Sequence, residues 1–162
     1  MNVEQASVSA IYEGWRSYQN TLSQALAPLT AEQHELRAGP GLRSVGEITA
    51  HIIGARARWF YQLMGEGGEE FATLGKWDRR GSPAKSAAEL IQGLESTWQG
   101  MHEAMAHWAP EEWQQTWPGE DLGDPEVISR QWVIWHLIEH DVHHGGEVSI
   151  TLGAHGVRAL DL

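Results

Sequence analysis

The 162-residue sequence contains no cysteine. This absence excludes a disulfide framework, a thiolate metal site and a cysteine nucleophile. It also fits the reducing cytosol, so we expect a cytoplasmic protein. The N-terminus lacks the basic start and the apolar run of a secretory signal peptide. No segment approaches about 18 uninterrupted apolar residues, so we expect no part of the sequence to cross a bilayer.

Basic residues are scarce as well. The chain has 11 Lys and Arg against 22 Asp and Glu, which gives a formal net charge of −11. Nucleic acids and anionic membranes attract positively charged surfaces, so this balance argues against either partner. Hydrophobic residues make up 41% of the chain, enough for one packed core. We therefore expect a single domain over residues 1–162 that binds neither nucleic acid nor a membrane.

Apolar residues recur every three or four positions along four segments, a spacing typical of amphipathic helices. The first predicted helix spans about residues 4–26. The second follows Ser44 and stops at Gly65 or Gly67, and the third covers residues 86–108. The second and third each open with a serine followed three residues later by a glutamate, the pattern of a capping box.

The fourth predicted helix begins at Asp124, which serves as its cap, with Pro125 at the first helical position and Glu126 after it. The helix then runs to Leu152. Gly153 is the predicted C-cap, since glycine adopts the backbone conformation that ends many helices.

Residues 66–84 form the longest link without strong helical periodicity. At about 3.3 Å per residue, this link can run the length of a helix of roughly 30 Å. The third helix can therefore lie parallel to the second. We predict an all-α protein, a four-helix bundle in up-down-down-up order with a long crossover between helices two and three. An up-down-up-down order is the alternative.

Nine histidines are present, and four of them fall between residues 136 and 144. Positions four apart on a helix project from one face, so His140 and His144 can bind one ion from adjacent turns. His136 and His140 have the same spacing and form a second candidate pair. We expect His143 to take a supporting or interface role. The histidines expected on the surface or in loops are His34, His102, His107 and His155.

A third ligand must come from another helix, and His51 is the natural candidate. It lies seven residues after Ser44, roughly 10 Å along helix two at about 1.5 Å per residue. His144 lies eight residues before Leu152, roughly 12 Å from the end of helix four. If the two helices are antiparallel, these depths match. A single histidine on an apolar helix is more often a hydrogen-bonded core residue, so the His140–His144 cluster carries the prediction.

Glu147 lies seven residues beyond His140 and therefore faces within about 20° of the same direction. It can orient a ligand, take a coordination position or act as a catalytic base on metal-bound water. A helical glutamate is more often simply solvated. Gly145 and Gly146 each weaken the helix by about 1 kcal/mol relative to alanine. Their presence suggests the close approach of another helix or a ligand beside the site.

Residues 136–140 also match H-x-x-E-H, the inverted zinc-peptidase signature, in which the histidines bind zinc and the glutamate is the base. Such enzymes take a third ligand from a distant glutamate on a large scaffold. Only 22 residues follow His140, and three fixed residues in a histidine-rich helix are a weak match. The other alternative is a metal-free helical protein whose histidines only pack and hydrogen-bond.

Two segments resemble the DinB/YfiT-like superfamily. They are residues 47–52, EITAHI, with Trp59 downstream, and residues 140–147, HDVHHGGE. The resemblance extends over the helix order, the long crossing and the C-terminal Leu152-Gly153, and so over nearly the whole chain. The commoner family ending is H-H-R-G-Q. Here glycine replaces the arginine and glutamate replaces the glutamine, so substrate preference does not transfer.

The resemblance implies a four-helix bundle whose metal is held by His51, His140 and His144, rather than by the His136 pair. We expect one divalent ion, zinc or nickel, with iron or manganese as alternatives. Some relatives are thiol-dependent transferases or isomerases that activate a low-molecular-weight thiol such as bacillithiol or mycothiol. Others have no known activity, which leaves a non-catalytic metal- or ligand-binding stress-response protein as the alternative. Relatives often form homodimers, so a homodimer is expected.

Overall fold

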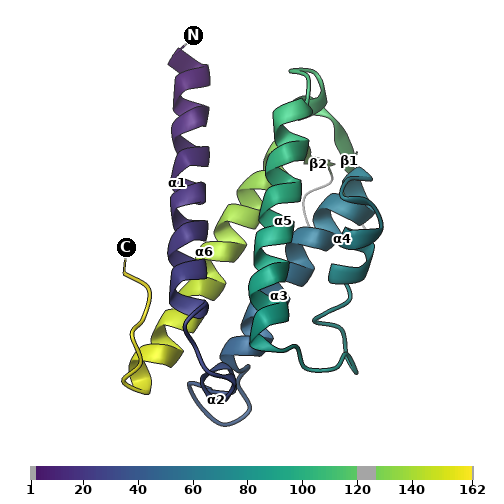
Figure 1. Ribbon diagram of the computed structural model, residues 1–162. Coiled ribbons are helices and arrows are strands. Elements are labelled where there is room, and N and C mark those ends of the chain that lie inside the picture. Colours follow the sequence, from purple (N-terminus) through teal and green to yellow (C-terminus); the bar gives the residue numbers. More distant parts are fainter. Residues whose placement is uncertain (1–2, 120–126, 162) are drawn as a thin grey trace.

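A computed structural model describes residues 3–119 and 127–161. Its four long helices are α1 (Val3–Leu26), α3 (Val45–Arg58), α5 (Ala87–His107) and α6 (Arg130–Ala154) (Figure 1). The connections contain the short helices α2 (Ala31–His34) and α4 (Gly68–Leu74). A π-helical turn, η1 (Trp59–Leu63), continues α3, and a 3-10 turn, η2 (Glu112–Gln114), follows α5. The described residues are mostly helical, so the predicted class is confirmed at this level.

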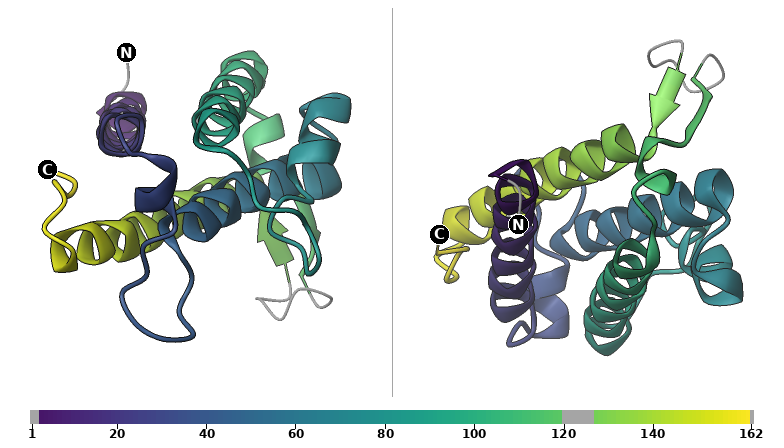
Figure 2. Two further views of the ribbon diagram at one scale, coloured as in Figure 1. Left: turned by 60° about the horizontal axis from the view of Figure 1, so that its bottom comes forward. Right: turned by 90° about the horizontal axis from the view of Figure 1, so that it is seen from above.

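The helix α3 occupies the centre of the arrangement, in contact with both α5 and α6, and α1 contacts the same two helices. The colours of Figure 1 show α1 and α6 running down the picture while α3 and α5 run up. In Figure 2, α1 and α5 form one layer, and α3 and α6 form a second layer inclined to it. Within the part of the chain that is described, no helix is both long and apolar enough to cross a membrane.

Serine–glutamate capping boxes begin two of the long helices. Ser44 and Ser86 each accept a hydrogen bond from the backbone N–H of the glutamate three residues on. The carboxylates of Glu47 and Glu89 accept from the backbone N–H groups of the two serines, over 2.7 and 2.8 Å. The two predicted capping boxes are therefore confirmed, and they fix where α3 and α5 begin.

The predicted start of helix four is not where α6 begins. The helix starts at Arg130, and the Ser129 hydroxyl caps it by accepting a hydrogen bond from the N–H of Trp132 over 3.1 Å. The predicted cap at 124–126 lies outside the described residues. Residues 127–129 are extended, so the helix is shorter at this end than its sequence pattern indicates.

The predicted C-cap of this helix is also wrong. The helix passes through Gly153 and ends at Ala154. Gly156, at φ 68°, adopts the left-handed conformation that reverses the chain. The N–H of Val157 then donates to the carbonyl of Leu152 over 3.0 Å, which satisfies one of the last free carbonyls of the helix.

Four short elements were not predicted: the strands β1 and β2 and the helices α2 and α4. The strands β1 (Thr116–Pro118) and β2 (Val127–Ser129) pair in an antiparallel ribbon, and three residues are too few to display strand alternation. The link 66–84 contains α4, whose Phe71 and Leu74 are buried. The helix α2, which Thr30 caps, is only four residues long. Such short elements depend on what they pack against rather than on their own periodicity.

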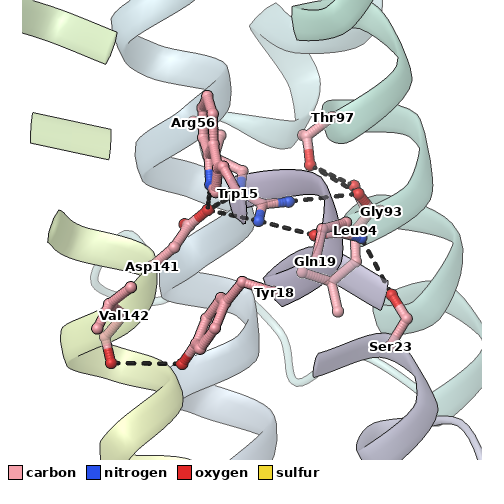
Figure 3. A network of polar contacts seen from close by, with 10 residues as sticks. All are labelled: Trp15, Tyr18, Gln19, Ser23, Arg56, Gly93, Leu94, Thr97, Asp141 and Val142. Atoms are coloured by element: carbon pink, nitrogen blue, oxygen red, sulfur yellow. Dashed lines mark hydrogen bonds and ion pairs between the residues drawn. The ribbon is translucent and has the colours of Figure 1, made fainter. Parts of the chain in front are cut away.

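A buried ion pair between Arg56 of α3 and Asp141 of α6 joins the two helices (Figure 3). Arg56 Nη2 donates to Asp141 Oδ2 over 2.6 Å, and both side chains are 0% exposed. The helix α1 joins the same network, because Trp15 Nε1 donates to Asp141 over 2.7 Å and Gln19 accepts from Arg56 over 2.8 Å. The network therefore fixes the rotation of α6, and with it the direction in which the adjacent His140 projects.

Removing one partner of this pair leaves the other charge buried, so we expect Asp141→Ala to lower the free energy of unfolding by about 3–5 kcal/mol. The double variant Arg56→Met/Asp141→Leu removes both charges and should recover part of that loss. Urea unfolding followed by circular dichroism measures both effects. An Asp141→Ala protein as stable as the parent would contradict the role given to the pair.

His34 is buried, and the expectation that it lies on the surface or in a loop is wrong. It is 3% exposed and belongs to α2, beside Gly46 in the first turn of α3. Neither ring nitrogen has a hydrogen-bond partner among the described residues. Burial lowers the pKa of His34, and the negative charge of Glu35 opposes that shift only in part.

His34 should make the fold sensitive to acid. Its pKa in the folded chain lies below the ordinary value of 6.5, so below that pH the unfolded chain binds a proton that the folded chain does not. We expect the free energy of unfolding to fall as the pH drops below about 6.5, and to fall less in His34→Leu. Urea titrations at several pH values measure this difference, with His102→Leu as an exposed control. Equal pH dependence in the parent and His34→Leu would refute it.

Candidate metal centre

His51 of α3 faces His140 and His144 of α6 in the space between the two helices. The ring centroids of the three pairs are 4.8, 4.6 and 4.4 Å apart. One ring nitrogen from each residue lies within 4.8 Å of the other two. The Nε2 atoms of His51 and His140 are 3.1 Å apart. The structure thus brings together the three histidines selected from the sequence, and they could hold one metal ion.

The positions of these residues along their helices produce the cluster. His51 lies in the second turn after the Ser44 cap, while His140 and His144 are one turn apart on α6. Because α3 and α6 run in opposite directions (Figure 1), the start of α3 lies beside the C-terminal half of α6. The matching depths expected from residue counting are therefore found.

Asp78 determines which nitrogen of His51 is available. Its Oδ2 lies 2.7 Å from His51 Nδ1, and an ionised carboxylate only accepts, so Nδ1 carries the proton and Nε2 presents a lone pair to the cluster. Burial would raise the pKa of Asp78. The hydrogen bonds from His51 and Arg58 outweigh burial and hold this pKa well below its usual range. The carboxylate is therefore charged at neutral pH.

Arg58 and Gly54 keep Asp78 in place. Both carboxylate oxygens bind the Arg58 guanidinium, with Nη2 at 2.9 Å from Oδ2. A Cβ on Gly54 would lie 2.7 Å from Asp78 Oδ1, so glycine is needed for this approach. His51, Gly54 and Arg58 thus share one face of α3, against which Asp78 packs. Asp78 is not among the predicted site residues, because no spacing in the link 66–84 ties it to His51.

Glu147 orients His144 in the same manner. Its Oε2 lies 2.7 Å from His144 Nδ1, which leaves the His144 Nε2 lone pair for the cluster. Of the roles considered for Glu147, this geometry is that of an orienting residue. His143 is exposed and lies 3.8 Å from the other oxygen of Glu147, so it supports the carboxylate from outside the three-histidine cluster. His143, His144 and Glu147 form a second close group of ligand atoms that shares His144.

His140 has the most strongly shifted pKa of the cluster. Burial, followed by the neighbouring His144 and His51, lowers the pKa of His140 to about 2. Its Nδ1 is buried and has no hydrogen-bond partner within the described residues. Burial also lowers the pKa of His144, although the hydrogen bond to Glu147 opposes it. Both rings are therefore neutral at pH 7, the form that binds metal ions.

This donor set fits a first-row divalent ion. Asp78 and Glu147 accept hydrogen bonds from the ring N–H groups of His51 and His144, so two lone pairs face the centre of the cluster. Among the described residues of the cluster, His140 is the one ring left to supply an N–H there. One donor cannot satisfy both lone pairs, whereas one cation would satisfy all three rings. Zinc–imidazole bonds of about 2.0–2.1 Å in a tetrahedral site separate the nitrogens by about 3.3 Å. The 3.1 Å between the Nε2 atoms of His51 and His140 is close to that spacing.

His136 does not join the cluster. Its ring stacks on Trp132 at 5.0 Å and meets Trp59 edge-on at 5.1 Å. Glu139 is exposed, and no metal-ligand group among the described residues contains either His136 or Glu139. The inverted zinc-peptidase arrangement is therefore not assembled, and the alternative His136–His140 pair is not used.

The two glycines of α6 differ in their surroundings. A Cβ on Gly145 would overlap the hydroxyl of Tyr18 from α1, so the predicted close approach of another helix is confirmed there. The Tyr18 hydroxyl lies 3.4 Å from the carbonyl of Val142 (Figure 3). A Cβ on Gly146 would meet nothing within 4 Å, so the same prediction is wrong for Gly146.

Comparison with known proteins finds helical relatives. A profile of the DinB family matches residues 1–160. One similar solved structure is a DinB-like protein from Bacillus cereus ATCC 10987, with a TM-score of 0.73, 18% identity and coverage of 96% of this chain and 97% of that one. Another is a conserved protein from Enterococcus faecalis, with a TM-score of 0.67, 14% identity and coverage of 94% and 99%. No curated protein matches the sequence.

Asp78→Asn keeps the shape of the side chain and removes its charge, so the hydrogen bond that orients the His51 ring should weaken. We expect zinc affinity to fall by about 10–100-fold while the helical content is retained. Competition with a chromophoric chelator, on protein stripped of metal, measures this affinity. Asp161→Asn, at an exposed carboxylate near the C-terminus, is the matched control. If Asp78→Asn binds zinc as tightly as that control, Asp78 does not orient the ligand.

Proposed function

The chain belongs to the DinB family, and on that premise we propose that it binds one divalent metal ion through His51, His140 and His144. One observation carries the proposal: two imidazole lone pairs, each oriented by a carboxylate, converge with a third neutral ring where too few N–H groups are present to satisfy them. The proposed ion is zinc or nickel, which imidazole suits, with iron or manganese as alternatives.

We further propose a metal-dependent thiol S-transferase or isomerase acting with a low-molecular-weight thiol. Three protein ligands leave a coordination position open, as in catalytic rather than structural sites. When bound, the ion would lower the pKa of a thiol or water, which supplies a nucleophile near neutral pH. The chain's own residues prepare that position: Asp78 and Glu147 hold two ligand rings, and the stacked Trp132 and His136 lie beside His140.

Glu147 is also the proposed proton acceptor, as an alternative to a purely orienting role. Burial raises the pKa of its carboxyl, but the hydrogen bond from His144 and the nearby positive charges lower it overall. The carboxylate is therefore ionised at neutral pH. Its side chain is 44% exposed, so a ligand that reaches the cluster can contact it.

The second candidate function is a non-catalytic metal- or ligand-binding stress-response protein. The same three histidines support it, because an ion can hold a ligand without turnover. Assays with several low-molecular-weight thiols and electrophiles separate the two. Turnover that is lost in a folded His140→Ala protein supports the enzyme, whereas a retained ligand without turnover supports the binding protein.

We propose that α1, α3, α5 and α6 form an up-down-down-up four-helix bundle, which the helix directions in Figure 1 support. We propose that residues 1–162 act as one domain, since the family profile matches nearly all of them. A cytoplasmic homodimer is the proposed state of the protein.

Elemental analysis of protein purified without a histidine tag should give about one zinc or nickel ion per chain. His51→Ala and His144→Ala should each lose most of that metal, because two imidazoles remain where three converge. His107→Ala, at an exposed histidine of α5, is the control and should keep it. A parent protein that takes up no metal, even after incubation with zinc or nickel, would exclude the proposed centre.

A further inference from the structure

A pocket of about 590 Å³ lies between the first turns of α3 and the segment 77–85 that precedes α5. Pockets that hold small molecules commonly measure about 300–1,000 Å³, so this volume suits a ligand larger than a simple ion. His51 and Asp78 are part of its wall. A molecule in this pocket would therefore touch the same residues that form one side of the metal centre.

The lining of this pocket is basic although the chain as a whole is acidic. Four of the 11 basic residues of the chain line it, in a protein with a formal net charge of −11. This concentration is local and does not follow from composition. The four basic lining residues are Arg37, Arg43, Arg79 and Lys85.

Most of the acidic groups in the lining are already paired. Glu47 binds Arg37 at 2.6 Å, and Asp78 is held by Arg58 and His51. Within residues 3–119 and 127–161, none of the other three basic lining residues forms an ion pair. Glu35 is the one acidic lining residue in the same condition. Three positive charges against one negative charge are thus left to act on a ligand.

These three groups surround the pocket from different segments. Arg43 directly precedes the Ser44 cap of α3, whereas Arg79 and Lys85 belong to the opposite wall. Lys85 Nζ lies 5.0 Å from the ring centroid of Trp77, which also lines the pocket. The lining therefore places an aromatic ring beside a positive charge, a combination that suits a carboxylate-bearing organic molecule.

We propose that this basic pocket binds a carboxylate-bearing small molecule. Its anionic groups would be held by Arg43, Arg79 and Lys85, and its other end would reach the metal centre past His51. The contact with the metal centre rests on the proposed function. The substrate or thiol of that function would then be an organic anion. Charge-assisted hydrogen bonds from guanidinium and ammonium groups to carboxylates are among the stronger polar contacts in proteins.

The test compares two probes of the same size and shape, N-acetylglutamate with two carboxylates and N-acetylglutamine amide with none. Binding is followed by the indole N–H signal of Trp77 in the NMR spectrum of tryptophan-labelled full-length protein, identified by its loss in Trp77→Phe. We expect the diacid to bind about tenfold more tightly than the diamide, and the difference to shrink at high salt. Equal binding of the two probes, or no Trp77 shift with the diacid, would overturn the proposal.

Charge-removing variants locate the contacts. Arg43→Gln, Arg79→Gln and Lys85→Gln should each weaken diacid binding by about threefold and leave diamide binding unchanged. Arg80 adjoins Arg79 in the sequence but does not line the pocket. Arg80→Gln removes the same charge and should change neither diacid binding nor diamide binding. A loss in Arg80→Gln as large as in the other three would mean that net charge, not the pocket, attracts the anion, and would overturn the proposal.

Running the titrations with zinc-loaded and metal-free protein separates the pocket from the metal centre. Diacid binding in a protein that takes up no zinc would sustain the pocket while the proposed metal function fails. Stoichiometric zinc without preference for the diacid would sustain the metal centre while the basic pocket fails. The three pocket variants should keep the zinc stoichiometry of the parent, because none of them removes a metal-ligand candidate.

Discussion

The buried ion pair between Arg56 and Asp141 sets the relation of α3 to α6 on which the three-histidine cluster depends. Two charges placed out of water are costly unless they meet each other and satisfy their remaining hydrogen bonds. Trp15 and Gln19 of α1 supply those bonds, so the pair is stable in one relative placement of three helices. His140 adjoins Asp141 in the sequence. A rotation of α6 that broke the ion pair would therefore also turn the His140 imidazole away from His51.

The same principle, a charge held where it has a partner, recurs outside the core. Asp78 is held by Arg58 and in turn holds His51, while Glu147 holds His144. The centre of the cluster is then left with lone pairs and few donors, a state that a cation relieves. The basic pocket beside the cluster is lined by four positively charged side chains, although the whole chain has a net charge of −11. The charge of this lining is therefore opposite in sign to that of the whole molecule.

Local signals predicted the helices well where the physics is local. The capping boxes at Ser44 and Ser86 involve hydrogen bonds within four residues, and both are present. Predictions failed where packing decides. The burial of His34 depends on α2 packing beside α3. The ribbon before α6 depends on the pairing of two strands that are each too short to display alternation. The C-terminal turn at Gly156 could have been predicted, since glycine favours it, but Gly153 offered the same signal three residues earlier.

The sequence by itself determined the helical class and the spacing that puts His140 and His144 on one face of a helix, because both follow from a period of about 3.6 residues. Residue counting from Ser44 also placed His51 at a matching depth, on the condition that the two helices are antiparallel. Only the tertiary structure decided that His136 packs against tryptophans, that Asp78 orients His51, and that basic side chains from two segments form one pocket. Those outcomes depend on which surfaces meet after the chain has crossed from α3 to α5, and no local period encodes that choice.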